Sequence, residues 1–224
     1  MKTHDHVLNE SSFIAFIMSA IGGFSDVFCF IALQHLFTAH ITGNIVLIIT
    51  YAIDKTPGLV SRALAIPVFI IIASIASFII ESRGVSKFNY RVWLGFEAIL
   101  FLALMFLGVY LGHLMAVDSI TFVIASMLPV TAMAIHNTIM KTYLYRLPPT
   151  TVMTGNLTGF VIDTTALLIK KNKKNRNVRQ NLKKTSWVLA GFIFGGSLSL
   201  AYLWINFYAI PFIIILIIIA ILSA

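Results

Sequence analysis

The chain has 224 residues, of which 59% are hydrophobic and 11% are charged, and its formal net charge is +8. The mean hydropathy of +0.94 excludes an ordinary soluble domain, because a fold of this size could not bury so much apolar surface. The positive charge does not indicate nucleic-acid binding, since the basic residues lie in short polar gaps between apolar runs. That pattern is typical of the cytoplasmic loops of membrane proteins. We therefore expect a polytopic, all-α membrane protein whose main partner is the lipid bilayer.

The first half of the chain contains four apolar segments. Ser11–Leu33 is long enough to cross a hydrocarbon core of about 30 Å, and it contains Asp26 within its apolar sequence. Ile41–Ile53 has only 13 residues, which is about 20 Å of helix and short for a span. Ala63–Ile80 and Val92–Leu114 are again long enough to cross. The second segment is therefore a candidate half or re-entrant helix.

The second half also contains four apolar segments. Ile120–Ile139 is long enough to span, and Val152–Leu168 follows after a turn with two prolines. Trp187–Ile205 comes next, and Phe212–Leu222 ends the chain after a break at Asn206–Pro211. Aromatic residues near this break fit the level of a membrane interface.

The triplet Thr-Gly-Asn occurs once in each half. It occupies positions 42–44 and 154–156, which are 112 residues apart, and an apolar run follows it both times. A duplication at half the chain length predicts two related halves, residues 1–115 and residues 116–224, that form a single membrane domain.

The distribution of Lys and Arg separates two topologies. If all eight segments cross the membrane, 11 of these residues lie on one side and 5 on the other. If the two triplet segments enter and leave on one side, all but Lys55 and Arg62 share a side, 14 of the 16. The positive-inside rule favours this second model, an inverted repeat with six spanning helices and two half helices, with residues 170–184 in the cytoplasm. The alternative is eight spanning helices, because Val152–Leu168 is long enough to cross by itself.

Two stretches of the chain resemble a known family. These are GGFSDVFCFIALQHLFTAHITGN in the first half and TAMAIHNTIMKTYLYRLPPTTVMTGNLTG in the second. Both are similar to the YoaK-like family of bacterial inner-membrane proteins, whose function is unknown. The family tends to have Gln-Asn where this chain has His136-Asn137. The resemblance covers essentially the whole chain, and it implies a multi-pass protein of the bacterial inner membrane without implying a biochemical activity.

The triplets suggest a binding site at the start of two helices. Glycine allows close approach of the backbone, and Thr and Asn can cap free N–H groups. A helix N-terminus carries a partial positive charge that favours an anion or the carboxylate of a zwitterion. The alternative is that each triplet is an ordinary cap with a close-packing glycine. The candidate substrate-binding residues are Asp26, Thr42, Gly43, Asn44, His136, Asn137, Thr154, Gly155, Asn156 and Asp163.

Three acidic residues lie within apolar sequence, where an unpaired charge is costly. Asp26 has two open roles: coupling to a proton or cation, or accepting hydrogen bonds from the backbone of the first triplet. Asp163 lies seven residues after Asn156, on the same face of a helix. Glu97 is expected to form an ion pair with Arg91 near the membrane interface.

These features favour a small secondary transporter or channel for an anionic or zwitterionic solute. No catalytic residues, metal site or cofactor are expected, because no histidine pair has metalloprotease spacing and no nucleotide-binding motif occurs. The alternatives are an integral-membrane enzyme, with a polar cluster at headgroup level that includes His35 or His40, and an accessory subunit. A homo-oligomer is plausible for so short a chain.

Overall fold

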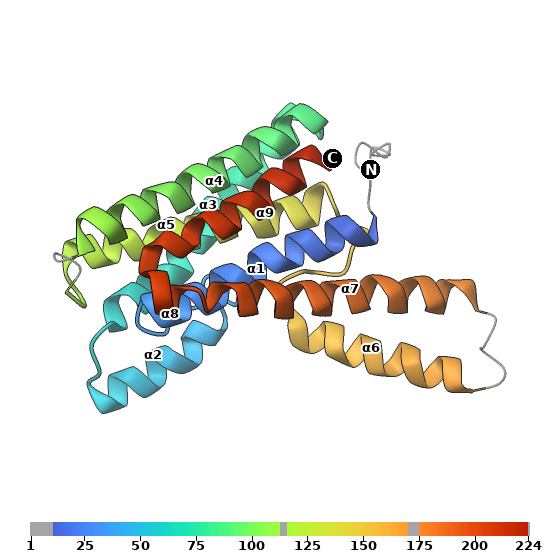
Figure 1. Ribbon diagram of the computed structural model, residues 1–224, viewed down its shortest axis with the longest axis horizontal. Helices are drawn as coiled ribbons and strands as arrows, with labels where there is room; N and C mark the ends of the chain where they lie inside the picture. Colours follow the sequence, from blue (N-terminus) through green and yellow to red (C-terminus); the bar gives the residue numbers. More distant parts are fainter. Residues whose placement is uncertain (1–10, 113–115, 170–174, 224) are drawn as a thin grey trace.

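The computed structural model describes residues 11–112, 116–169 and 175–223, and the regular structure of these residues is helical throughout (Figure 1). The boundary at 115 between the expected halves and the first part of the basic segment 170–184 lie outside the described residues. The helices in chain order are α1 Ser12–Ala32, α2 Gly43–Asp54, α3 Leu59–Arg83, α4 Lys87–Tyr110, α5 Ile120–Thr142, α6 Met153–Leu168, α7 Arg176–Ser199, α8 Tyr202–Ile205, the 3₁₀ helix η3 Asn206–Ala209 and α9 Ile210–Leu222.

Five helical stretches of the described residues are long and apolar enough to cross a membrane. They are Ser12–Ala32, Leu59–Arg83, Lys87–Tyr110, Ile120–Thr142 and Arg176–Leu222. Large apolar side chains such as Ile70 and Phe78 point outward from them and are exposed, as expected for contact with lipid. This confirms the prediction of an all-α, multi-pass membrane protein.

The last of these stretches is divided at Asn206. Its φ of 50° with a ψ of −135° interrupts the helical path between α8 and α9, and asparagine is among the non-glycine residues that most often adopt a positive φ. The break expected at Asn206–Pro211 is therefore present, and α9 begins at Ile210 with a proline in its first turn.

Helix α7 begins earlier than the sequence suggested. Trp187 was the expected start, but the helix begins at Arg176, so that the basic residues up to Lys184 are helical. The side chain of Asn175 accepts hydrogen bonds from the N–H groups of Asn177 and Val178 and caps the helix. Because Lys, Arg, Gln and Leu all favour helix, the cap is enough to extend α7 out of the apolar region.

Helix α1 lies at the centre of the bundle and is buried over most of its length. Its closest neighbour is α7, and the two backbones touch at glycines. A Cβ atom at Gly191 or Gly195 of α7 would overlap the carbonyl oxygens of Phe16 or Ala20 in α1, and one at Gly23 would overlap the carbonyl of Phe192. Such close approach of small residues maximises van der Waals contact between helices in lipid.

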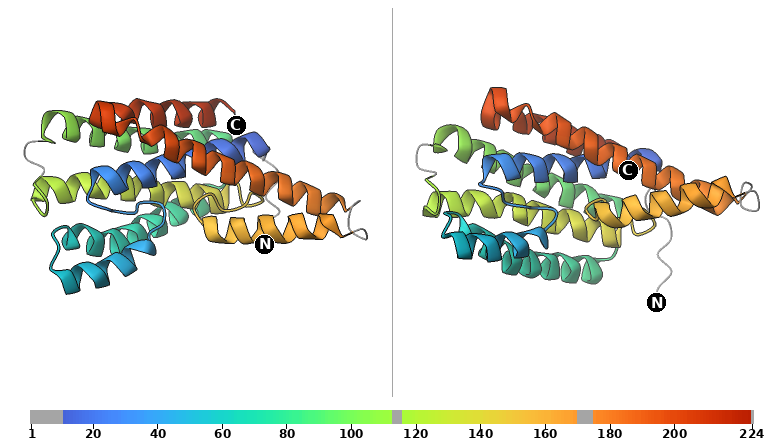
Figure 2. Two further views of the ribbon diagram at one scale, coloured as in Figure 1. Left: turned by 60° about the horizontal axis from the view of Figure 1, so that its bottom comes forward. Right: turned by 90° about the horizontal axis from the view of Figure 1, so that it is seen from below.

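The two helices that carry the triplets point in opposite directions. The N-terminal ends of α2 and α6 face the middle of the molecule, and their C-terminal ends point toward opposite ends of the bundle (Figures 1 and 2). Helix α2 packs on α3, where the Arg62 guanidinium lies 3.7 Å from the centre of the Tyr51 ring. Helix α6 packs on α7.

The basic residues gather at one end of the bundle. The α3–α4 turn, the end of α5 and the start of α7 all lie at this end, whereas the α2–α3 turn with Lys55 lies at the other (Figure 1).

The close contact between α1 and α7 makes a direct prediction. Gly195→Ala should lower the free energy of unfolding by about 1–3 kcal/mol, because the added methyl group overpacks the contact with the Ala20 backbone. Gly159→Ala in α6 is the control: nothing lies within 4 Å of the added Cβ, and alanine favours helix. Thermal unfolding in detergent should show a lower Tm for the first variant alone; equal Tm values would contradict the packing.

Candidate functional site

Asp26 holds the chain segment that joins α1 to α2. Its Oδ1 atom accepts hydrogen bonds from the N–H groups of Thr38 at 2.9 Å and Ala39 at 2.6 Å, and the N–H of His40 donates to Oδ2 at 3.2 Å. The Nδ1 atom of His40 also lies against Oδ2. Asp26 is only 3% exposed, so these donors replace water around a buried carboxylate. The backbone donors are residues 38–40, and so the expected hydrogen bonds from the triplet backbone were assigned to the wrong segment.

Asn44 pairs with both backbone polar groups of Phe37. Its Oδ1 atom accepts from the Phe37 N–H at 3.0 Å, and its Nδ2 atom donates to the Phe37 carbonyl at 2.7 Å. The side chain of Thr42 makes no capping hydrogen bond to α2. The first triplet therefore does not cap its helix as the sequence suggested; its asparagine ties the preceding loop to α2.

The loop before α6 is held with the same spacings. The Nδ2 atom of Asn156 donates to the Pro149 carbonyl at 2.6 Å, seven residues back, as Asn44 does to Phe37. The Thr151 hydroxyl donates to Oδ1 of Asn137 at 2.6 Å. That pair is separated by 14 residues, like Asp26 and His40. Each loop is therefore bonded both to the helix that precedes it and to the asparagine in the first turn of the helix that follows it.

Glu97 forms a buried pair with His136 in place of the interfacial pair expected with Arg91. The Nδ1 atom of His136 lies 3.1 Å from Oε1 of Glu97, and both side chains are fully buried. The expectation was wrong because α4 begins at Lys87 and places Glu97 on the same face as the buried residues Tyr90 and Leu94. The Nε2 atom of His136 lies 3.4 Å from the Thr150 hydroxyl, which connects this pair to the second loop.

A cavity of about 540 Å³ lies where the N-terminal ends of α2 and α6 face each other. Its lining consists of Asp26, Val27 and Phe30 of α1, Phe37 and His40 of the first loop, and Thr42, Gly43, Met153 and Phe192. Three of the predicted site residues, Asp26, Thr42 and Gly43, therefore face one cavity. Gly43 is needed there because a Cβ atom would come within 2.8 Å of the Phe37 ring.

The other predicted residues lie outside this lining. Asn44, His136, Asn137 and Asn156 hold the two loops in place through the contacts described above. The first turn of α6 contains Thr154 and Gly155, which are exposed, and Asp163 is half-buried two turns further along the same helix.

Six lining residues were not among the predicted site residues: Val27, Phe30, Phe37, His40, Met153 and Phe192. His40 lies 14 residues after Asp26, and Thr151 lies 14 residues after Asn137; this repeated spacing was the signal available for His40.

Helices α2 and α6 differ in whether the backbone N–H groups of their first turns are hydrogen-bonded. In α2 the N–H groups of Gly43, Asn44 and Ile45 bond to carbonyls three residues back, at 2.8 to 3.1 Å. In α6 the N–H groups of Met153, Thr154 and Gly155 have no acceptor among the described residues. Free N–H groups at a helix start attract the negative end of a ligand.

A family model described as "Protein of unknown function (DUF1275)" matches residues 14–223. The chain therefore belongs to this family, in agreement with its resemblance to the YoaK-like proteins. No curated protein and no solved structure matches the chain.

Removal of the Asp26 carboxylate should destabilise the protein. Asp26→Ala leaves the N–H groups of Thr38, Ala39 and His40 without their acceptor, which costs at least about 3 kcal/mol when the cost of each buried donor is counted. The expected fall in Tm is about 6–12 °C for a chain of this size. Asp26→Asn retains one acceptor oxygen and should lose less.

Asp54→Ala is the control, because Asp54 is exposed at the end of α2. If Asp26→Ala and Asp54→Ala have equal Tm values, Asp26 does not hold the loop.

Proposed function

We propose that this protein is a small-molecule transporter or channel of the bacterial inner membrane. The observation that carries the proposal is the cavity where α2 and α6 begin, about halfway along the long axis of the molecule. Short helices that start at the middle of a membrane and face each other across a site are a recurring design of transporters. Non-helical loops at that depth are tolerated only where they are buried in protein or line a cavity, and the first loop meets both conditions.

In this proposal six helices span the membrane, and the two halves of the chain have inverted topology. Helices α2 and α6 have 12 and 16 residues, or about 18 Å and about 24 Å, which is less than a hydrocarbon core of about 30 Å. They leave the centre toward opposite ends of the bundle (Figure 1). The end that carries the α3–α4 turn and the start of α7 is the cytoplasmic one, since it holds most of the basic residues.

The lining of the cavity favours a solute with an apolar body and one anionic group. Val27, Phe30, Phe37, Met153 and Phe192 supply apolar and aromatic surface. Few polar groups then fix the orientation of the solute, as is usual for small-molecule sites. The Asp26 carboxylate is matched by the donors of the first loop. Met153 is the α6 residue of the lining, and its free N–H group favours the carboxylate of a solute.

The two histidines that the enzyme alternative requires both have polar partners. The enzyme alternative requires His35 or His40 in a polar cluster open to the headgroup level. His40 instead pairs with Asp26, and the Nδ1 atom of His35 lies 2.5 Å from the Tyr51 hydroxyl. Each histidine thus has a structural partner.

Transport can be tested with a panel of radiolabelled amino acids and 2-oxo acids that have branched or aromatic side chains. A solute that binds should raise the Tm of the purified protein by mass action. The same solute should enter proteoliposomes that contain the protein. Thr42→Trp fills the cavity and should abolish both effects. Thr158→Trp is the control, because Thr158 is exposed on α6 outside the lining.

Two results would contradict the proposal. If Thr42→Trp retains the full Tm increase, the cavity is not the binding site. If a solute binds at the cavity but never crosses the membrane of the proteoliposome, the protein does not transport it.

A further inference from the structure

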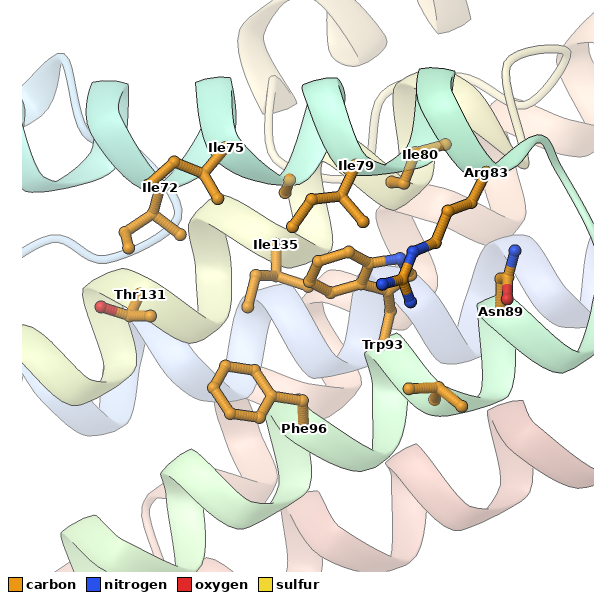
Figure 3. A pocket seen from close by; sticks show the side chains of 12 residues that line it. Ile72, Ile75, Ile79, Ile80, Arg83, Asn89, Trp93, Phe96, Thr131 and Ile135 are labelled. Carbon is orange, nitrogen blue, oxygen red and sulfur yellow. The ribbon is translucent and has the colours of Figure 1, made fainter.

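A second cavity, of about 460 Å³, opens on the outer face of the bundle between α3 and α4 (Figure 3). Isoleucines of α3, including Ile72 and Ile79, form one wall, and Trp93 and Phe96 of α4 form the other. Figure 3 shows Ile135 of α5 between them. This groove is therefore apolar along most of its length, and it is separate from the cavity at α2 and α6.

One end of the groove is cationic. Arg83 is the last residue of α3, and its guanidinium points into the groove beside Trp93 (Figure 3). Neither a hydrogen bond nor an ion pair joins Arg83 to another described residue. Glu81 is two residues away, a spacing that puts two side chains on different faces of a helix. A guanidinium has five N–H donors and a permanent positive charge. Because no described residue matches them, the polar end of the groove is suited to an anion.

The length of the groove corresponds to one leaflet of a bilayer. From Arg83 to Ile72 is 11 residues of α3, or roughly 16 Å of helix, and half of the hydrocarbon core is about 15 Å. Arg83 lies at the α3–α4 turn and therefore at the membrane surface, with Trp93 beside it at a depth where tryptophan is favoured. An occupant with an anionic head at Arg83 and a chain toward Ile72 matches both charge and length.

We propose that this groove binds an anionic phospholipid of the leaflet that surrounds the α3–α4 turn. The lipid phosphate accepts hydrogen bonds from the Arg83 guanidinium, and one acyl chain lies between α3 and α4. The chain reaches the surface of α5 at Thr131 and Ile135, next to the buried His136. A second copy of this protein fits less well, because two copies that meet through this groove would each place an unpaired Arg83 guanidinium at the same membrane surface.

The groove contains a fluorescent probe of its own. The chain has three tryptophans, and Trp187→Phe together with Trp204→Phe leaves Trp93 alone. The protein is placed in phosphatidylcholine vesicles, into which phosphatidylglycerol with brominated acyl chains is titrated; bromine quenches tryptophan on contact. We expect brominated phosphatidylglycerol to reach half-maximal quenching at a mole fraction about five-fold lower than brominated phosphatidylcholine, the effect of one basic residue on an anionic lipid.

The matched variants are Arg83→Gln and Arg91→Gln. Arg91 is exposed on α4 at a similar level and does not line the groove. Arg83→Gln should remove the preference for phosphatidylglycerol, and Arg91→Gln should retain it. Equal losses in both variants would mean that general surface charge attracts the lipid, and this would overturn the proposal. Weak quenching by both lipids would also overturn it, because another copy of the chain would then cover Trp93.

Native mass spectrometry of the unsubstituted protein gives a second measurement that needs no tryptophan replacement. Phosphatidylglycerol adducts should survive activation better than phosphatidylcholine adducts, and Arg83→Gln should remove the difference. No difference in the unsubstituted protein would contradict the proposal.

Discussion

The interaction on which the structure depends is the pairing of loop backbone with buried side chains. Two loops leave the ends of α1 and α5 and return to the middle of the molecule before α2 and α6 begin. Backbone polar groups that are buried in the interior of a membrane protein must be paired within the protein. Asp26 accepts from three consecutive N–H groups in the first loop, and Asn44 pairs with both polar groups of Phe37. In the second loop Asn156 binds the Pro149 carbonyl, and Asn137 binds the Thr151 hydroxyl.

The positions of α2 and α6 follow from these contacts. Because each loop is tied to the helix before it, the next helix starts near the centre and not at the end of the bundle. Two helix starts then meet at one cavity, and the close contact of α1 with α7 at Gly23, Gly191 and Gly195 supports the surrounding wall. The Asp26 carboxylate is bonded to the first loop, so that the rest of the cavity lining is mainly apolar. Specificity in the proposed transporter therefore rests on few polar groups.

The sequence predicted those parts of the fold that depend on local patterns. The length of the first apolar segment predicted the two ends of α1 to within one residue. The second apolar segment was predicted to be short, and it forms the short helix α2. The start of α7 was missed because a run of Lys and Arg was interpreted as loop, although Asn175 caps it as a helix. Both triplets were recognised, but the hydrogen bonds of their asparagines depend on how each loop folds back, which spacing alone does not give. The partner of Glu97 depends on the packing of α4 against α5, and this lies beyond any local pattern.

The central claim is that α2 and α6 are half helices in inverted halves, and labelling of single cysteines tests it most directly. Cys29→Ser removes the one native thiol, and cysteines are then placed at Lys55, Arg83 or Arg146, in three different turns. A membrane-impermeant maleimide added to intact cells should label position 55, and positions 83 and 146 should react only after the membrane is opened. Labelling at 83 and 146 in intact cells, with position 55 protected, would mean eight spanning helices in parallel halves and would contradict this account.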